Sequence, residues 1–153
     1  MITEVGPDAI DDVMAVMERS FDPTFGEAWN RAQCLGILGL PGVWLSLDRA
    51  DGTVRGFALA RAIFDDAELL LIAVRPDARG HGVGRALLDH VIRTARERGA
   101  TRLHLEVREG NPALRLYNDC GFEPVGRRRN YYSGNEGQTL DAITLVRPID
   151  ADG

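Results

Sequence analysis

The spacing of apolar residues along the chain predicts several helices. Residues 8–19 place Ile, Val and Met at helical intervals, and a second helix is expected near 27–38, after a loop over 21–26. The strongest amphipathic stripe predicts a helix over 83–98, and Gly99 follows it as a stop signal.

Other stretches have the patterns of strands. Residues 67–74 end in a continuous apolar run, which favours a central strand buried on both faces. Residues 101–107 alternate between apolar and polar side chains, which is typical of a strand with one buried face. Further strands are expected over 2–5, 43–48, 53–64, 122–128 and 139–146.

A short helix is expected between Asn111 and Gly121. Asn111 is a favourable N-cap, Pro112 is a favourable first helical residue, and Gly121 ends the segment. Together these elements predict one α/β unit over residues 1–153, with about seven strands in a mixed sheet and four helices.

Composition narrows the possible classes of protein. The 153 residues are 44% hydrophobic and 27% charged, as in ordinary globular domains. The formal net charge of −5 argues against a partner that is a nucleic acid or an anionic membrane. No apolar stretch approaches 18 residues, and the first residues do not resemble a secretory leader. The two cysteines then suggest a reducing compartment, so a cytoplasmic protein is expected. Neither the cysteines nor the three histidines have metal-binding spacing, so we expect no metal.

The segment from Arg79 to Arg85 carries the clearest chemical signal. Its three glycines lie between the apolar strand and the strongest predicted helix. Glycines allow tight turns and close approach to a ligand, and a helix start presents free N–H groups and a positive dipole end. This arrangement suits a diphosphate, although a plain turn and helix cap is the alternative. Arg85 stands where a Walker loop needs lysine and where a Rossmann fingerprint needs a third glycine.

Two motifs at a characteristic separation resemble those of one family. Arg-x-x-Gly-x-Gly over 79–84, and Leu116-Tyr117-Asn118-Asp119-Cys120-Gly121-Phe122, are similar to signatures of the GNAT acetyltransferase superfamily. Residues 105–108, 128–132 and 141–143 further resemble the bacterial ribosomal-protein-alanine N-acetyltransferases. The resemblance covers about residues 55–149. It implies a GNAT-like α+β domain with a mostly antiparallel sheet, and acetyl-CoA as the co-substrate.

The resemblance also implies roles for individual residues. Glu106 would be the general base and Tyr117 the general acid, and Tyr131 and Tyr132 would border the acceptor cleft. Taken without the resemblance, Glu106 reads as a solvated strand residue and Tyr117 as partly core. Acetyl-CoA would be held by Ile72, Ala73, Val74, Arg79, Gly80, His81, Gly82, Val83, Gly84, Arg85 and Asn111. The span from Glu106 to Tyr117 is one residue shorter than is usual in the family.

The implied reaction is direct attack of an amine on the thioester, with no covalent enzyme intermediate and no role for either cysteine. The family's usual acceptor is the N-terminal α-amine of a ribosomal small-subunit protein. Two alternatives stay open at this point. One is a small-molecule amine as acceptor, and the other is a non-catalytic acyl-CoA-binding module. Trp29 is interpreted as core packing.

Overall fold

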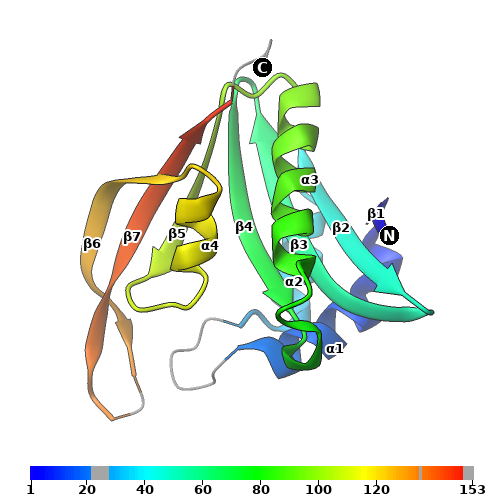
Figure 1. Cartoon of the computed structure of the whole chain (residues 1–153), viewed down its shortest axis with the longest axis horizontal. Coiled ribbons are helices and arrows are strands. Elements are labelled where there is room, and N and C mark those ends of the chain that lie inside the picture. Colours follow the sequence, from blue (N-terminus) through cyan, green and yellow to red (C-terminus); the bar gives the residue numbers. More distant parts are fainter. Residues whose placement is uncertain (22–27, 135, 150–153) are drawn as a thin grey trace.

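The computed structural model describes residues 1–21, 28–134 and 136–149. Within this part of the chain, seven strands form one twisted sheet in the order β1-β2-β3-β4-β5-β7-β6 (Figure 1). The β4–β5 pair is parallel and every other neighbouring pair is antiparallel. The predicted mixed, mostly antiparallel sheet is therefore confirmed. The strands are β1 (Ile2–Val5), β2 (Val43–Ala50), β3 (Thr53–Ile63), β4 (Asp66–Val74), β5 (Arg102–Arg108), β6 (Glu123–Ser133) and β7 (Thr139–Pro148).

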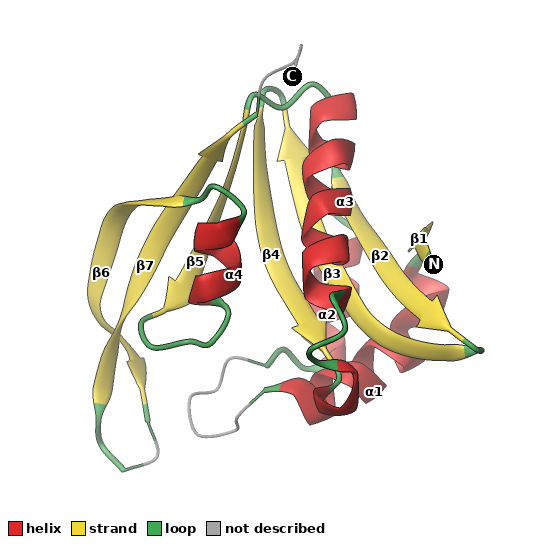
Figure 2. Cartoon of the chain, in the orientation of Figure 1, coloured by secondary structure: helices red, strands yellow, loops and turns green. Residues whose placement is uncertain are grey.

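Four α-helices lie among the described residues, as predicted (Figure 2). They are α1 (Ile10–Ser20), α2 (Arg31–Leu38), α3 (Val83–Glu97) and α4 (Leu114–Asp119). Short 3-10 turns over Pro7–Ala9 and Pro76–Ala78 precede α1 and α3. The expected loop over 21–26 lies mostly in residues 22–27, which are outside the described residues.

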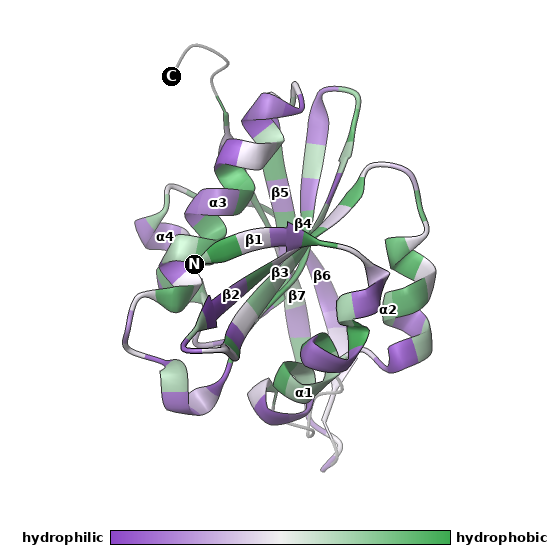
Figure 3. Cartoon of the chain, turned by 90° about the vertical axis from the view of Figure 1, so that its right-hand side faces the viewer, coloured by the Kyte–Doolittle hydropathy of each residue, from purple (hydrophilic) through white to green (hydrophobic). Residues whose placement is uncertain are grey.

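The sheet separates two apolar cores. Buried residues of α3 and α4 pack on one face, and buried residues of α1 and α2 pack on the other. On α3 the side chains of Val83, Leu87, Leu88 and Val91 are almost fully buried. In Figure 3, α1 and α3 each carry hydrophilic and hydrophobic residues on different sides, as expected for helices that cover a sheet. The helical stripe predicted over 83–98 is thus the contact with the sheet.

The parallel pair of strands opens into a fork. β4 and β5 are in register only from Asp66 opposite Arg102 to Glu68 opposite His104. Beyond these residues the two strands diverge, as Figure 1 shows. A sheet that parts in its middle exposes backbone groups on both inner edges. The fork therefore provides both a cleft and hydrogen-bonding groups to line it.

An irregularity in β4 lies directly at the fork. Leu59 and Ala60 on β3 are adjacent, but they pair with Leu71 and Leu69, so Leu70 is an extra residue on β4. One extra residue reverses the side-chain alternation beyond it. Leu69 faces the core of α3, and so does Ile72 after the bulge.

Two predictions need correction. The apolar run in β4 is not buried on both faces throughout, because Leu70, Leu71, Ile72 and Val74 are only partly buried where the fork exposes them. The short helix α4 begins at Leu114 rather than at Pro112, and its N-cap is Ala113. The side chain of Asn111 accepts a hydrogen bond from the backbone N–H of Ala113 at 2.8 Å, within the turn that precedes the helix.

Candidate active site

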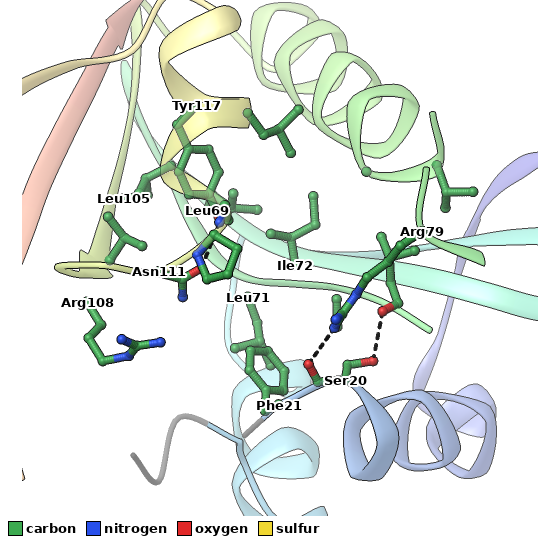
Figure 4. Close-up of a pocket in the computed structure, with 18 of the residues that line it drawn as sticks. Ser20, Phe21, Leu69, Leu71, Ile72, Arg79, Leu105, Arg108, Asn111 and Tyr117 are labelled. Atoms are coloured by element: carbon green, nitrogen blue, oxygen red, sulfur yellow. Dashed lines mark hydrogen bonds between the residues drawn. The ribbon is translucent and has the colours of Figure 1, made fainter. Parts of the chain in front are cut away.

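A cavity of about 700 Å³ occupies the fork between β4 and β5. Its walls come from the end of α1, the inner edge of β4, the loop before α3 with the first turn of that helix, β5, and α4. Figure 4 shows Ile72, Arg79 and Tyr117 converging on it from three of these elements. Segments far apart in the sequence thus meet at one site.

One end of the cavity is the start of α3. Gly80 and Gly82 adopt positive φ angles of 81° and 77°, which the side chains of other residues rarely tolerate. A Cβ atom added at either glycine would meet no other atom within 4 Å, so the loop is open on that side. The first hydrogen bond of the helix runs from the N–H of Ala86 to the carbonyl of Gly82, so earlier N–H groups have no partner within the helix. This end can accept an anionic group such as a diphosphate.

The inner edge of β4 supplies backbone groups to the cavity. The N–H of Arg75 donates to the carbonyl of Arg55 on β3 at 2.8 Å. Backbone groups alternate in direction along a strand, so those of Val74 point away from β3 and into the fork. The Ser20 hydroxyl lies 3.2 Å from the Val74 carbonyl oxygen, on this same side. The N–H of Val74 is therefore positioned to bind an oxygen atom placed in the cavity.

Arg79 connects this edge to the end of α1. Its guanidinium group donates to the carbonyl of Ser20 at 2.7 Å (Figure 4). A positive charge beside the last carbonyl groups of a helix is favourable. Ser20 and Phe21 line the cavity, although neither was predicted from sequence. Their position depends on the packing of α1, for which the motifs give no signal.

Tyr117 enters the cavity from α4. Its side chain is 5% exposed, and its ring packs edge-on against Phe122 with the two centroids 5.8 Å apart. Asn111 and Leu116 also line this wall. In Figure 4 the ring of Tyr117 lies close to Leu69 and above Asn111. The packing fixes the direction of the ring, so its hydroxyl is held at a defined place.

A second cavity, of about 870 Å³, lies on the other side of the fork. Residues near α2, β6 and β7 line it, and they include Tyr131, Tyr132 and Thr144. The two cavities share six residues, which are Trp29, Leu69, Leu70, Leu105, Glu106 and Tyr132. The two cavities therefore meet at the fork, the first bounded by α3, α4 and the end of α1, and the second by α2 and β6. We call this second cavity the acceptor groove, because the sequence resemblance implies an acceptor cleft beside Tyr131 and Tyr132.

Glu106 stands at the junction of the two cavities. Its carboxylate lies 3.0 Å from Nε of Arg128 on β6, and Arg128 stacks on the ring of Tyr131 at 5.2 Å. Tyr131 in turn packs edge-on against Tyr132, with centroids 5.1 Å apart. Sequence alone did not reveal this ion pair, because it depends on the register of β5, β7 and β6.

The cysteines lie apart from this chemistry. Burial raises the pKa of both the Cys34 and Cys120 thiols, which keeps them protonated and poorly nucleophilic at neutral pH. Among the described residues, no group of His, Cys, Asp and Glu side chains is arranged to hold a metal ion. No helix of the described part is long and apolar enough to span a bilayer.

Comparison with known proteins identifies this arrangement. The profile of the acetyltransferase (GNAT) family matches residues 10–122, which is most of the chain. The chain belongs to the acetyltransferase (GNAT) family. It is therefore an acetyl-CoA-dependent acyltransferase, as its sequence motifs predicted.

Relatives in the acetyltransferase family are similar to this chain in sequence as well as in fold. The [ribosomal protein bS18]-alanine N-acetyltransferase of Escherichia coli K12 is 43% identical over 100 residues, which cover 65% of this chain and 67% of that protein. The enzyme of the same name from Haemophilus influenzae is 40% identical over 91 residues, covering 60% and 62% of the two chains. The crystal structure of the ribosomal-protein-S18-alanine N-acetyltransferase from E. coli superimposes with a TM-score of 0.88. It covers 100% of this chain and 96% of that one, at 31% identity.

The residues predicted to bind acetyl-CoA in this acetyltransferase gather at the first cavity, with one exception. All of them line it except His81, which is exposed at the tip of the glycine loop. Glu106 and Tyr117 line the first cavity as well. Of the two tyrosines predicted at the acceptor cleft, Tyr132 borders both cavities and Tyr131 borders only the acceptor groove.

Trp29 and Arg108 are two wall residues whose place the sequence did not indicate. Trp29 is half-buried against the core of α1 and α2, as interpreted, but it also lines both cavities. Arg108 is 8% exposed and reaches the first cavity from the end of β5 (Figure 4). Its guanidinium group donates to the carbonyl of Glu109 at 3.2 Å. A buried cation in this wall adds positive charge beside the site.

The glycine loop gives a direct test of the first cavity. We expect Gly82→Val to weaken CoA binding by about tenfold or more, or ~1.4 kcal/mol, because a β-branched side chain would strain the left-handed turn and obstruct the helix start. Isothermal titration with CoA would measure it. Gly99→Val is the matched control, because Gly99 also has a positive φ and open space around it but lies at the other end of α3. Equal CoA affinity in both variants would place the diphosphate site elsewhere.

Proposed function

We propose that this acetyltransferase moves the acetyl group of acetyl-CoA to the N-terminal α-amine of a protein, by direct attack of the amine. The observation that carries the proposal is the fork, at which two neighbouring cavities share Glu106. A donor that enters from the side of α3 and an acceptor that enters from the side of α2 would meet there. Neither substrate has to pass the other.

The first cavity suits acetyl-CoA at both of its ends. The start of α3, with Gly80 and Gly82 in left-handed turns and Arg79 and Arg85 beside them, would bind the diphosphate. The inner edge of β4, from Ile72 to Val74, would hold the pantetheine arm through backbone hydrogen bonds. The N–H of Val74 would stabilise the negative charge that develops on the carbonyl oxygen during attack. Asn111 and the remaining lining residues of the loop would complete this site.

Glu106 would act on the acceptor as general base. An α-amine has a pKa of about 7.7–8.0, so much of it is protonated at neutral pH and must lose a proton before it can attack. Glu106 lies at the junction between the cavities, where the amine would arrive. Its pairing with Arg128 holds the carboxylate in one orientation.

Tyr117 would act on the other side of the reaction as general acid. The departing thiolate needs a proton, and a positioned phenol can supply it. The ring is buried and packed against Phe122, so the hydroxyl does not have to be ordered on binding. This assignment leaves both cysteines without a catalytic role.

The names of the relatives support a protein as the acceptor. Those from E. coli and H. influenzae are named as alanine N-acetyltransferases of ribosomal protein bS18, and we propose an acceptor of the same class, with alanine first, in the cytoplasm. The acceptor groove extends from α2 to β6, past Tyr131 and Tyr132, and can hold several residues of an extended chain. A small-molecule amine would leave most of that groove empty.

Binding of the donor should be visible without turnover. We expect acetyl-CoA to raise the melting temperature of the protein, because a ligand that binds only the folded state stabilises it by mass action. At about 100 times the dissociation constant, the gain is roughly 2.7 kcal/mol. Differential scanning fluorimetry with and without acetyl-CoA measures the shift. If millimolar acetyl-CoA left the melting temperature unchanged, the donor site would be refuted.

The acceptor is tested by turnover on a panel of substrates. Release of CoA would be followed with peptides that differ only in their first residue, and with small amines such as a polyamine and a free amino acid. The proposal predicts turnover of peptides, best with alanine first, and little turnover of small amines. A preference for small amines would overturn the acceptor assignment but leave the donor site intact. Absence of turnover with every amine, despite acetyl-CoA binding, would favour the non-catalytic alternative.

A further inference from the structure

Four charged or titratable side chains meet where β4 and β5 part. His104 on β5 points between two carboxylates of β4, with Nδ1 at 3.2 Å from Asp66 and Nε2 at 3.0 Å from Glu68. Arg102 also pairs with Asp66, at 3.0 Å. The His104 side chain is 27% exposed and that of Glu68 is 44% exposed. This cluster is not explained by the roles assigned above to the donor, the base or the acid.

The cluster belongs to the acceptor groove. Glu68 and His104 both line it, together with Glu106. His104 and Glu106 are two residues apart on β5, so they share a face of the sheet and lie roughly 7 Å apart along the strand. An acceptor whose amine reaches Glu106 would therefore pass close to His104 and Glu68.

The charges of the groove are balanced only while His104 carries a proton. Among the described residues that line it, the charged side chains are Glu68, His104, Glu106 and Arg128. Arg128 pairs with Glu106, and His104 pairs with Glu68. When His104 becomes neutral, its positive charge is lost and the net charge of the groove becomes more negative by one unit.

The charged groups around His104 come from β4, β5 and β6. From β4 it faces Asp66 and Glu68, and its own strand adds Arg102 and Glu106. On β7, the uncharged Val146 lies opposite His104, and the uncharged Thr144 is the next residue on the same face. On β6, which pairs with β7, Glu123 lies opposite Val146, and Arg128 is a further charged residue of that strand. From the side of α2, the groove is lined by Ala28, Trp29 and Gln33, none of them charged.

We propose that His104, held between Asp66 and Glu68, is a specificity-determining residue of the acceptor groove, and that its charge state sets how strongly the groove favours a cationic acceptor peptide. This inference rests on the proposed function, because it takes the acceptor to be a peptide. While His104 is protonated it neutralises Glu68, and the groove discriminates little between a lysine and a neutral residue. Once His104 is neutral, the carboxylate of Glu68 is free to attract a positive side chain.

The protonation range of His104 follows from its partners. The hydrogen bond to Glu68 raises the pKa of His104 above its usual value, with Asp66 adding to the effect and burial opposing it. The folded-state pKa is therefore higher than the unfolded value. The associated stability is fully present below the unfolded pKa and is lost as the pH rises through the folded pKa. Acceptor preference should change as the pH passes through the folded-state pKa of His104, with the cationic peptide favoured more as the pH rises.

The test compares two peptides that share the first residue and differ by Lys or Gln at the second. Their affinities for the protein–CoA complex would be measured between about pH 5.5 and pH 9, a range that brackets a histidine with raised pKa. In the wild type we expect the affinity ratio of the Lys peptide to the Gln peptide to rise about threefold to tenfold with pH, the effect of one charge at roughly 8 Å in a partly solvated groove. Because both peptides carry the same α-amine, its own ionisation largely cancels in the ratio.

Variants separate this account from a structural role. His104→Gln should hold the ratio high at every pH of this range, because the carboxylate of Glu68 is then without its histidine. Glu68→Gln should lower the ratio at every pH, because it removes the carboxylate that attracts the lysine, while the rise with pH remains because His104 still loses its proton. His90→Gln is the matched control, because His90 lies on α3 away from the groove, and it should keep the wild-type pH dependence. Melting temperatures would show that each variant folds.

The outcomes are distinct. A ratio that does not change with pH in the wild type, or a slope that persists in His104→Gln, would overturn the inference. A binding ratio that depends on pH, without acetylation of either peptide, would support the role of His104 in peptide preference but refute the proposed reaction. The binding measurement uses CoA rather than acetyl-CoA, so it does not depend on turnover.

Discussion

Replacing Tyr117 with phenylalanine should lower turnover about 10²–10⁴-fold, the range typical of general acid–base groups. The substitution keeps the ring, and with it the edge-on contact to Phe122 and the burial in the core. It removes only the hydroxyl that we assign to protonating the thiolate. The loss should appear in kcat, with acetyl-CoA affinity little changed, because this hydroxyl matters mainly as the C–S bond breaks.

A steady-state assay with a good peptide acceptor, together with titration of acetyl-CoA, measures both quantities. Tyr131→Phe is the matched control, because Tyr131 is 52% exposed and borders only the acceptor groove. That variant should keep a near-normal kcat. If Tyr117→Phe retained more than about half of the wild-type kcat, far from a general-acid effect, the ring would be only a core residue and the acid would have to be sought elsewhere.

Glu106→Gln is expected to cause a loss of similar size, about 10²–10⁴-fold, that depends on pH. At a pH below the α-amine pKa of about 7.7–8.0, the acceptor must give up a proton, and the variant lacks the group that takes it. At higher pH more of the amine is already neutral, so the deficit should shrink. The ratio of wild-type to variant kcat/KM, followed across this range, gives the measurement.

Glu123→Gln provides the comparison for Glu106, since Glu123 is an exposed carboxylate at the start of β6 and lies outside both cavities. It should leave the pH profile unchanged. A deficit in Glu106→Gln that is the same at every pH would indicate that Glu106 only orders the groove through Arg128. It would then not act as the base.

Periodicity alone placed most of the elements. The stripe over 83–98 and the alternation over 101–107 correspond closely to α3 and β5. Side chains that face a core recur every 3.6 residues in a helix and every two residues in a strand, so the two patterns are easily told apart. The strand predicted over 122–128 continues to Ser133 instead. A register shift between Arg128 and Tyr132, with Asn130 at a φ of 55°, interrupts the alternation of side chains along this strand. The residues after Arg128 therefore lack the two-residue period by which a strand is predicted.

The site was predictable where a motif fixes the local backbone. The glycine turn before α3 could be read directly, because its conformation is set by neighbours in sequence, whereas the place of Tyr117 came from the resemblance to the acetyltransferase family. The pairing of Arg128 with Glu106 depends on strands that meet only through β7. The cluster of His104 needs the parallel register of β4 against β5. Such contacts arise from topology, which local patterns do not specify.

The central claim is that an α-amine, brought through the acceptor groove, meets acetyl-CoA at the fork. The most direct test is to incubate the wild-type protein with acetyl-CoA and one peptide that carries both a free N-terminal alanine and an internal lysine, and to locate the acetyl group by tandem mass spectrometry. The account predicts acetylation of the N-terminal amine, with the lysine unmodified, and no reaction of the same peptide when its N-terminus is blocked. Acetylation of the lysine, or of neither amine while a small amine is acetylated, would contradict it.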